Sequence, residues 1–280
     1  MTGVLSSDRQ GACRRGGPRL AVIGAGAMGE ALLAGWLASG WEPDDIVIVD
    51  AHAPRVAELQ QRHGVRGVQM VEAASADTLV LAVKPYQMDS VLQELSPSLP
   101  ASSLVVSIAA GVTLDQLAAG LPQGQGIIRV MPNTPALVGQ GMAGIAPGGN
   151  ASQAQCDGVV ELFRAVGKAI VVDEESLHAL TGLSGSGPAY LFYIAEAMVE
   201  AGVHQGLTRG QATELVHQTF LGAGTMLAGS GETATVLRER VTSPAGTTAA
   251  ALRAMDDHGV RAGMLAAVEA CVQRSRDMSH

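Results

Sequence analysis

A glycine-rich segment near the N-terminus constrains the fold of this chain more than any other feature. Leu20-Ala21-Val22-Ile23 is typical of a buried strand, Gly24-Ala25-Gly26-Ala27-Met28-Gly29 follows it directly, and residues 30–39 form a helical run. In such a GxGxxG turn the first glycine makes the tight turn, the second admits a pyrophosphate to the backbone, and the third lets the helix pack on the strand. A second apolar strand, residues 46–49, ends at the acidic Asp50. Together these features predict a dinucleotide-binding unit.

Apolar runs typical of strands alternate with helical runs through the first half of the chain. This alternation predicts an α/β fold, a mainly parallel sheet with helices on both faces and with ligands beyond the carboxyl ends of the strands. The strand ends carry Lys84-Pro85, Ala109-Ala110-Gly111 and Pro132-Asn133-Thr134-Pro135, each a candidate cofactor loop. The further predicted strands are 78–83, 104–108, 127–131 and 169–172, with helical segments such as 86–95 and 113–119 between them.

After about residue 174 the pattern changes to long apolar stripes at helical spacing, which predicts an all-helical C-terminal half. Residues 183–188 are predicted to cap the first helix there, and the apolar surface exceeds what one small bundle can bury, so we expect at least a dimer. The expected boundaries are a flexible leader (1–17), a dinucleotide-binding domain (18–174) and a helical domain for substrate binding and dimerisation (175–280). The expected helices are 189–203, one after Thr208, 232–240, one after Ser243 and one after His258.

Composition narrows the functional class. A net charge of -8 with scattered basic residues argues against nucleic-acid binding. Cys13, Cys156 and Cys271 lie far apart without metal-ligand spacing, so we expect no metal and a cytoplasmic location. The apolar stretch 20–37 after Arg14-Arg15 is explained by strand, glycine turn and helix, so no membrane span is expected.

A second candidate site is the octapeptide Val241-Thr242-Ser243-Pro244-Ala245-Gly246-Thr247-Thr248, which leads into a helix. Ser243 can cap this helix, Pro244 suits its first turn, and Gly246 lets the backbone approach a ligand closely. The amides of Gly246, Thr247 and Thr248 would lack intrahelical acceptors, which favours an anion such as a carboxylate. The octapeptide alone is equally compatible with an ordinary capped helix.

Six segments, in order over about residues 19–275, resemble the pyrroline-5-carboxylate reductase family. The resemblance implies a Rossmann-type domain with a helical dimerisation domain, NADPH or NADH as cofactor, and reduction of 1-pyrroline-5-carboxylate to L-proline, the last step of proline biosynthesis. It also implies a homodimer that can assemble into a decamer. The segments are Gly24-Ala25-Gly26-Ala27-Met28-Gly29, Ala82-Val83-Lys84-Pro85, Ser107-Ile108-Ala109-Ala110-Gly111-Val112, Arg129-Val130-Met131-Pro132-Asn133-Thr134-Pro135, Ser184-Gly185-Ser186-Gly187-Pro188-Ala189-Tyr190 and the octapeptide 241–248.

The resemblance also implies roles for individual residues. Ser243, with the amides of Gly246 and Thr247, would hold the ring carboxylate, and the Thr248 hydroxyl would orient the imine nitrogen as the catalytic residue. Ala245 stands where a second glycine is usual, and Gln69 where an asparagine is usual. The implied cofactor-binding residues are Gly24, Gly26, Ala27, Met28, Asp50, Gln69, Ala82, Val83, Lys84, Pro85, Ala109, Ala110 and Asn133.

Several alternatives stay open at this point. Asp50 can bond the adenosine ribose hydroxyls and repel a 2′-phosphate, which favours NADH, whereas Arg55 could reach such a phosphate. A non-catalytic dinucleotide-binding sensor would share the fold. A related two-domain imine or 3-hydroxyacid dehydrogenase is a further alternative. The hydroxyacid type relies on a lysine in a helix of its second domain, but Lys84 and Lys168 both precede the helical half. The histidines without an accompanying motif and the adjacent acidic pairs of the second half are interpreted as structural or solvated residues. They are His178, His204, His217, His258, Glu174-Glu175 and Asp256-Asp257.

Overall fold

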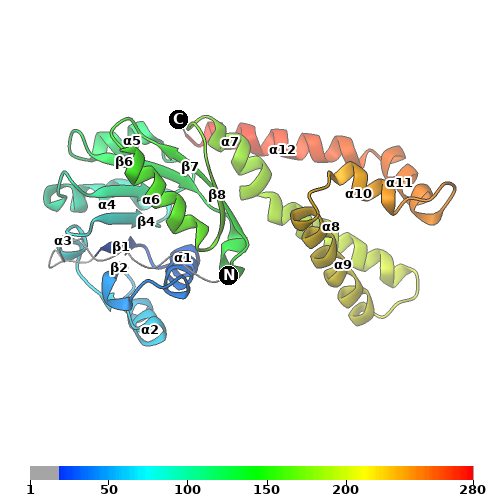
Figure 1. The fold of residues 1–280 in the computed structure, drawn as a ribbon, viewed down its shortest axis with the longest axis horizontal. Coiled ribbons are helices and arrows are strands. Elements are labelled where there is room, and N and C mark those ends of the chain that lie inside the picture. Colours follow the sequence, from blue (N-terminus) through cyan, green and yellow to red (C-terminus); the bar gives the residue numbers. More distant parts are fainter. Residues whose placement is uncertain (1–18, 280) are drawn as a thin grey trace, which may run out of the picture. The chain divides into compact units, whose positions relative to one another are not determined.

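The computed structural model describes residues 19–279, and the leader expected over 1–17 lies outside them. The chain forms two compact units (Figure 1). The first extends to Leu177 and includes Met278, and the second is His178–Asp277.

The first unit is built on an eight-stranded sheet with the order β3-β2-β1-β4-β5-β6-β7-β8 (Figure 1). Neighbouring strands are parallel except for β6 and β7, so the expected mainly parallel α/β fold is confirmed. The strands are β1 (Leu20–Ile23), β2 (Ile46–Val49), β3 (Arg66–Gly67), β4 (Thr78–Leu81), β5 (Leu104–Ser107), β6 (Gly126–Met131), β7 (Gly141–Pro147) and β8 (Gly167–Val171).

Helices cover both faces of this sheet. One face packs against α1 (Ala27–Ala38), α2 (Ala53–His63) and α6 (Gln153–Arg164), which bury Trp36, Leu59 and Phe163. The other face packs against α3 (Met70–Ala73), α4 (Met88–Leu95) and α5 (Leu114–Gly120). Because central parallel strands are buried on both faces, their sequences are continuously apolar, and this is why β1, β2, β4 and β5 can be recognised in the sequence.

Several elements of the first unit were not expected from the sequence, namely the strands β3 and β7 and the helices α2, α3 and α6. The sequence of β7, Gly-Met-Ala-Gly-Ile-Ala-Pro, begins with glycine and ends with proline, and both residues are unfavourable in strands. This composition did not indicate a strand, although β7 pairs antiparallel with β6. Helix α1 begins at Ala27, three residues earlier than expected, so the glycine turn itself is the helix start.

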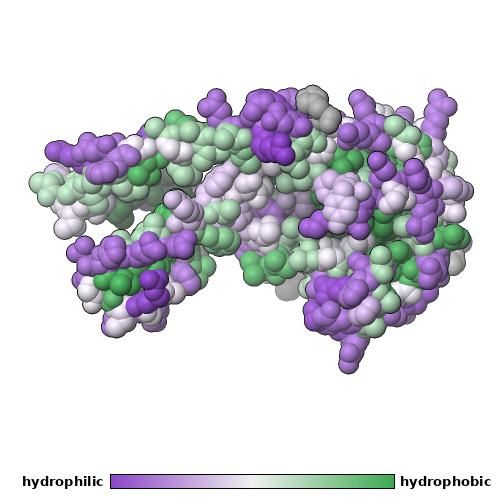
Figure 2. Space-filling view, turned by 180° about the vertical axis from the view of Figure 1, so that it is seen from behind, coloured by the Kyte–Doolittle hydropathy of each residue, from purple (hydrophilic) through white to green (hydrophobic). Residues whose placement is uncertain are grey.

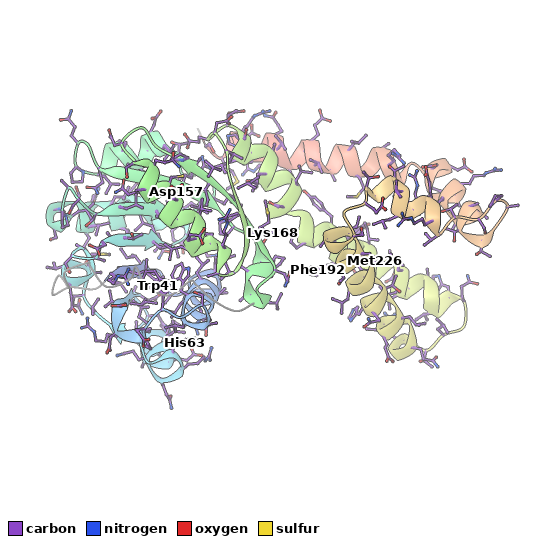
Figure 3. The ribbon with its side chains drawn as sticks, viewed as in Figure 1. Trp41, His63, Asp157, Lys168, Phe192 and Met226 are labelled. Atoms are coloured by element: carbon purple, nitrogen blue, oxygen red, sulfur yellow. The ribbon has the colours of Figure 1, made fainter. Side chains whose placement is uncertain are left out.

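The second unit is all-helical, as expected. It contains α8 (Gly187–His204), α9 (Arg209–Gly229), α10 (Ala234–Arg240), α11 (Thr247–Asp257) and α12 (Val260–Asp277), and α7 (Ser176–Leu180) leads into it. Its compact core is small, with only Val199, Ala212 and Val216 in the buried cluster. Hydrophobic residues therefore remain at its surface (Figure 2). Phe192 on α8 is 70% exposed and Met226 on α9 is 54% exposed (Figure 3).

The expectation that residues 183–188 cap a helix is confirmed in position, because Ser186 is the N-cap of α8, but the Ser186 side chain makes no capping hydrogen bond. Thr181–Gly185 forms a π-helical turn between α7 and α8, in which the Ser186 amide donates to the Thr181 carbonyl over 2.8 Å. Gly182 in this turn lies against α12, where a β-carbon would come 2.8 Å from a Val272 methyl group. The segment is thus a packing site inside an almost continuous helical stretch.

Candidate active site

The expected cofactor residues follow six adjacent parallel strands, β3-β2-β1-β4-β5-β6. Because carboxyl ends of parallel strands share one edge of the sheet, the fold brings these residues into one row. Along this row lie Gln69 after β3, Asp50 after β2, the turn 24–28 after β1, residues 82–85 after β4, Ala109 and Ala110 after β5, and Asn133 after β6.

Glycine is suited to each of the three positions of the turn for a different structural reason. Gly24 has a φ of +96°, and a β-carbon there would lie 2.7 Å from the Ala82 carbonyl carbon. A β-carbon on Gly29 would lie 2.4 Å from the Gly24 carbonyl oxygen, so this glycine allows the helix to pack on the strand. Gly26 faces open space, because a β-carbon there would meet nothing within 4 Å. The turn therefore leaves room for a phosphate only at its middle glycine, beside the unpaired amides of the α1 start.

Asp50 ties the end of β2 to this turn. One carboxylate oxygen accepts the Ala25 amide over 2.7 Å, and the other accepts the His52 amide over 2.8 Å. The Arg55 side chain also reaches the turn, because its Nε donates to the Ala25 carbonyl over 2.9 Å. Both polar groups of Ala25 are thus held from the β2–α2 segment.

The other loops of the row differ in exposure. Lys84 is exposed, and its backbone amide donates to the Gln87 side chain over 3.2 Å. Gln69 is also exposed, at the start of α3. Asn133 is buried, and its Oδ1 accepts the Met142 amide over 2.8 Å, so it also fixes the start of β7.

A pocket of about 530 Å³ opens beside the loops after β4 and β5. Pro85, Met88 and Ala110 line it, and Met278 lies on its rim against Gly111. Side chains of α4 and α5 form much of the remaining lining.

The octapeptide differs from expectation in its local geometry. Helix α11 begins at Thr247 with Gly246 as its N-cap, so Ser243 and Pro244 lie in the preceding turn and Ser243 does not cap the helix. The Gly246 amide is not available to a ligand, because it donates to the Ser243 carbonyl over 3.1 Å. The amides without intrahelical acceptors are those of Thr247, Thr248 and Ala249.

Ser243 and Gly246 depend on each other. A β-carbon at Gly246 would lie 2.3 Å from the Ser243 hydroxyl, so only glycine leaves that hydroxyl in place. Between them, Ala245 has a φ of 56° and is the only residue other than glycine with a positive φ in the described part of the chain. Proline at the second position and a positive φ at the third are typical of a type II turn, which prefers glycine at this third position.

A partly buried ion pair of the first unit was missed by sequence reasoning. Arg129 on β6 is 6% exposed at its side chain, and its Nη1 donates to Glu174 over 2.9 Å. The same Glu174 oxygen accepts the Leu114 amide at the start of α5 over 2.7 Å. Glu174 is therefore a structural residue that joins β6 and α5, and its only sequence signal was an acid next to the pattern change near residue 174.

The cluster behind the glycine turn was missed as well. Glu30 forms ion pairs with Arg55 and Arg62, and both arginines also pair with Glu58. Burial raises the pKa of Glu30, but the hydrogen bonds from Arg55 and its other basic neighbours outweigh this and lower the pKa to about 2. The spacing of Arg55, Glu58 and Arg62 on α2 was the available signal.

The histidines do not form a site. His178 is buried and its Nδ1 lies 2.9 Å from the Ser275 hydroxyl, which indicates a structural role. Over residues 19–279, no group of histidine, cysteine or acidic side chains could hold a metal ion. In the same range no helix is long and apolar enough to cross a membrane.

Comparison with known proteins covers nearly the whole chain. Residues 174–278 match the family model described as pyrroline-5-carboxylate reductase dimerisation. Residues 19–111 match the model described as NADP oxidoreductase, coenzyme F420-dependent. The helical unit is thus an oligomerisation unit, which agrees with its small core and its exposed apolar residues.

Relatives that match nearly the whole chain belong to the same family as the dimerisation model. The pyrroline-5-carboxylate reductase of Escherichia coli K12 is 40% identical over 264 residues, covering 93% of this chain and 98% of the relative. The structure of the enzyme from Coxiella burnetii superposes with a TM-score of 0.89 at 35% identity, covering 94% of this chain and 99% of that one. The Plasmodium falciparum enzyme, solved with NADP bound, gives a TM-score of 0.83 at 29% identity over 94% of this chain and 98% of that one. The chain belongs to the pyrroline-5-carboxylate reductase family.

Proposed function

We propose that this protein is a pyrroline-5-carboxylate reductase that transfers hydride from NADPH or NADH to the C=N carbon of 1-pyrroline-5-carboxylate, giving L-proline. The observation that carries the proposal is that this family member has both sets of residues that the reaction needs, one for the dinucleotide and one for the substrate carboxylate. The first unit has a row of dinucleotide loops, and the second has a helix start with unpaired amides and adjacent hydroxyls.

The dinucleotide is held by backbone more than by side chains. The pyrophosphate lies at Gly26, where the amides of Ala27 and Met28 at the α1 start have no helical acceptors. Lys84 adds a positive charge from the end of β4, and Ala82, Val83 and Pro85 line the same loop. Ala109, Ala110 and Asn133 flank the nicotinamide, which supplies the hydride when bound.

The substrate is held by its carboxylate. The Thr247 amide and the Ser243 hydroxyl bind the carboxylate oxygens at the start of α11, where the helix dipole favours a negative charge. The contribution of Gly246 is its missing side chain, since its amide is used within the turn. Two or three such contacts fix the ring, so that the imine carbon is presented in one orientation.

Thr248 is the catalytic residue in an orienting role. Its hydroxyl is half-buried and hydrogen-bonds the imine nitrogen. A protonated imine accepts hydride readily, so no strong acid is required and a hydroxyl of ordinary acidity is sufficient.

The test of this site is a Thr248→Ala variant. We expect kcat/KM for the imine to fall roughly 10- to 100-fold, the value of one hydrogen bond to a charged group, with unchanged dinucleotide affinity. Thr248→Ser should recover most of the activity because it restores the hydroxyl. Thr225→Ala on α9, which removes the same methyl group and a hydroxyl that donates to the Leu221 carbonyl within its own helix, is the matched control. Equal turnover by wild type and Thr248→Ala would contradict the role given to this hydroxyl.

We also propose that the second unit forms a homodimer and that dimers assemble further into a decamer. The exposed side chains of α8 and α9 support an intersubunit surface. Sedimentation equilibrium decides between two and ten chains. We place the protein in the cytoplasm, because Cys156 and Cys271 are free thiols and the sequence lacks disulfide spacing.

A further inference from the structure

The position after β2 decides which dinucleotide a fold of this kind accepts. An acid at this place hydrogen-bonds the adenosine ribose hydroxyls of NADH, whereas an arginine nearby accommodates the 2′-phosphate of NADPH. In this chain the acid is Asp50, and the nearest arginine along the chain is Arg55. The structure shows what each side chain does.

Asp50 is fixed and keeps acceptor capacity. The amides of Ala25 and His52 occupy one position on each carboxylate oxygen. A carboxylate offers about four acceptor positions, so two remain for ribose hydroxyls. These backbone contacts also hold the negative charge at the strand end, where a 2′-phosphate would have to lie.

Arg55 is turned away from that position. Its Nε donates to the Ala25 carbonyl over 2.9 Å, its Nη1 donates to Glu58 over 2.7 Å, and its Nη2 pairs with Glu30. Glu30 is 19% exposed, so solvent screens the pair only partly. Hydrogen bonds to Glu58 and Glu30 also raise the pKa of Arg55, so its charge is already committed to these acids.

The surrounding charge is unfavourable for a phosphate dianion. Asp50, Glu30 and Glu58 carry three negative charges against the two positive charges of Arg55 and Arg62. The residues between Asp50 and Arg55 contain neither lysine nor arginine, and His52 is exposed. Lys84 follows β4, two strands from β2 and therefore about 10 Å away along the sheet.

We propose that this protein prefers NADH to NADPH, with Asp50 binding the adenosine ribose and Glu30 acting as a specificity-determining positioning residue that withholds Arg55 from a 2′-phosphate. The inference rests on the proposed function for its kinetic test but not for its binding test. Glu30 touches neither cofactor nor substrate and acts only through Arg55.

The kinetic test compares kcat/KM for NADH and NADPH with the imine as acceptor. We expect the wild-type kcat/KM to be at least about tenfold higher for NADH than for NADPH. A factor of ten is the size of a charge interaction that shifts a pKa by about one unit. Asp50→Ser should reduce this ratio at least about tenfold, and Glu30→Gln should lower KM for NADPH without changing kcat. Asp45→Asn, at the opposite end of β2 and paired with the exposed Arg19, should leave the ratio unchanged.

The binding test needs no turnover. Calorimetry on the wild type compares ADP-ribose with its 2′-phosphorylated form, and we expect tighter binding of ADP-ribose. If the imine is not reduced but ADP-ribose still binds more tightly, the proposed function fails and the cofactor inference stands. Equal or tighter binding of the 2′-phosphorylated form, or a wild-type kcat/KM that favours NADPH, overturns the inference.

Discussion

At the scale of single residues, Ala245 is the position where sequence and backbone conflict. Its φ of 56° belongs to the left-handed region, which costs a residue with a β-carbon about 1 kcal/mol. The turn formed by residues 243–246 is therefore slightly strained.

Ala245→Gly should stabilise the protein by up to about 1 kcal/mol, because glycine adopts this φ freely and the relief exceeds the added entropy of the unfolded chain. Thermal unfolding measures the effect. Ala250→Gly, inside α11, is the control of opposite sign and should cost about 0.5 to 1 kcal/mol. A lower midpoint for Ala245→Gly than for wild type would mean that the alanine stabilises the turn.

Glu30 gives a pH-dependent prediction. Its pKa falls from 4.5 to about 2 in the folded chain, so its contribution to stability is full above about pH 4.5 and is lost as the pH falls toward 2. The difference in free energy of unfolding between wild type and Glu30→Gln should thus be large at pH 7 and shrink at pH 3, as measured with urea. Glu161→Gln removes an exposed ion pair with Arg164 and should change stability little at either pH. A Glu30→Gln difference that is constant with pH would argue against the cluster.

The sequence identified Asp50 but not what surrounds it. The reason is that Arg55 pairs with Glu30, which lies 25 residues away, and a single sequence contains no signal for a contact of that separation. Likewise, the amide of Gly246 was expected to bind substrate, and only the observed turn shows that Ser243 accepts it. Side-chain identity was predictable here, whereas hydrogen-bond partners were not.

At the scale of elements, different glycines of the glycine turn are expected to serve folding and dinucleotide binding. Gly26→Ala should fold normally, because its β-carbon meets nothing within 4 Å, but it should weaken dinucleotide binding at least about tenfold by blocking close approach of the pyrophosphate. Gly29→Ala should instead lower the thermal midpoint, because its β-carbon would meet the Gly24 carbonyl. Unchanged nucleotide affinity in folded Gly26→Ala would rule out this phosphate site.

The π-helical turn makes a further prediction about packing. Gly182→Ala would place a β-carbon 2.8 Å from a Val272 methyl and 3.2 Å from the Val268 carbonyl, so we expect a loss of stability of about 1 to 3 kcal/mol. Gly187→Ala, at the start of α8 and free of neighbours within 4 Å, should have little effect on the same thermal unfolding curve. Equal midpoints for the two variants would show that α12 does not need this glycine.

Elements with a continuous apolar sequence could be predicted, whereas an element interrupted by glycine and serine could not. The strands β1 and β2 are apolar throughout and β5 is apolar except for Ser107, and all three were found within one residue of their observed ends. The π-helical turn contains two glycines and a serine before Pro188, a composition typical of a helix boundary, yet it is helical and Gly182 packs closely against α12. Tertiary contact overrides local preference at that point.

At the scale of the whole molecule, the confirmed fold class and family follow from signals distributed along the chain, whereas the expected domain boundaries remain predictions. The small core of the second unit explains why its helices carry apolar residues on several faces. An exposed apolar surface of this kind marks an interaction site, which agrees with the match of this unit to a dimerisation domain.

Phe192→Glu should therefore weaken self-association, because it places a charge in the expected interface. Light scattering after size-exclusion chromatography should show a lower mass than for wild type. Val71→Glu, which changes a residue of the first unit that is 68% exposed, should leave the mass unchanged. An unaltered mass for Phe192→Glu would place the interface elsewhere.

The most direct test of the central claim is steady-state oxidation of NADH and NADPH followed by absorbance, with 1-pyrroline-5-carboxylate as acceptor and with glyoxylate and a 3-oxo acid as controls. The account predicts rapid turnover with the imine alone. Turnover with the 3-oxo acid instead would indicate a hydroxyacid dehydrogenase. Dinucleotide binding without turnover of any acceptor would contradict the assignment as a reductase and would indicate a dinucleotide-binding sensor.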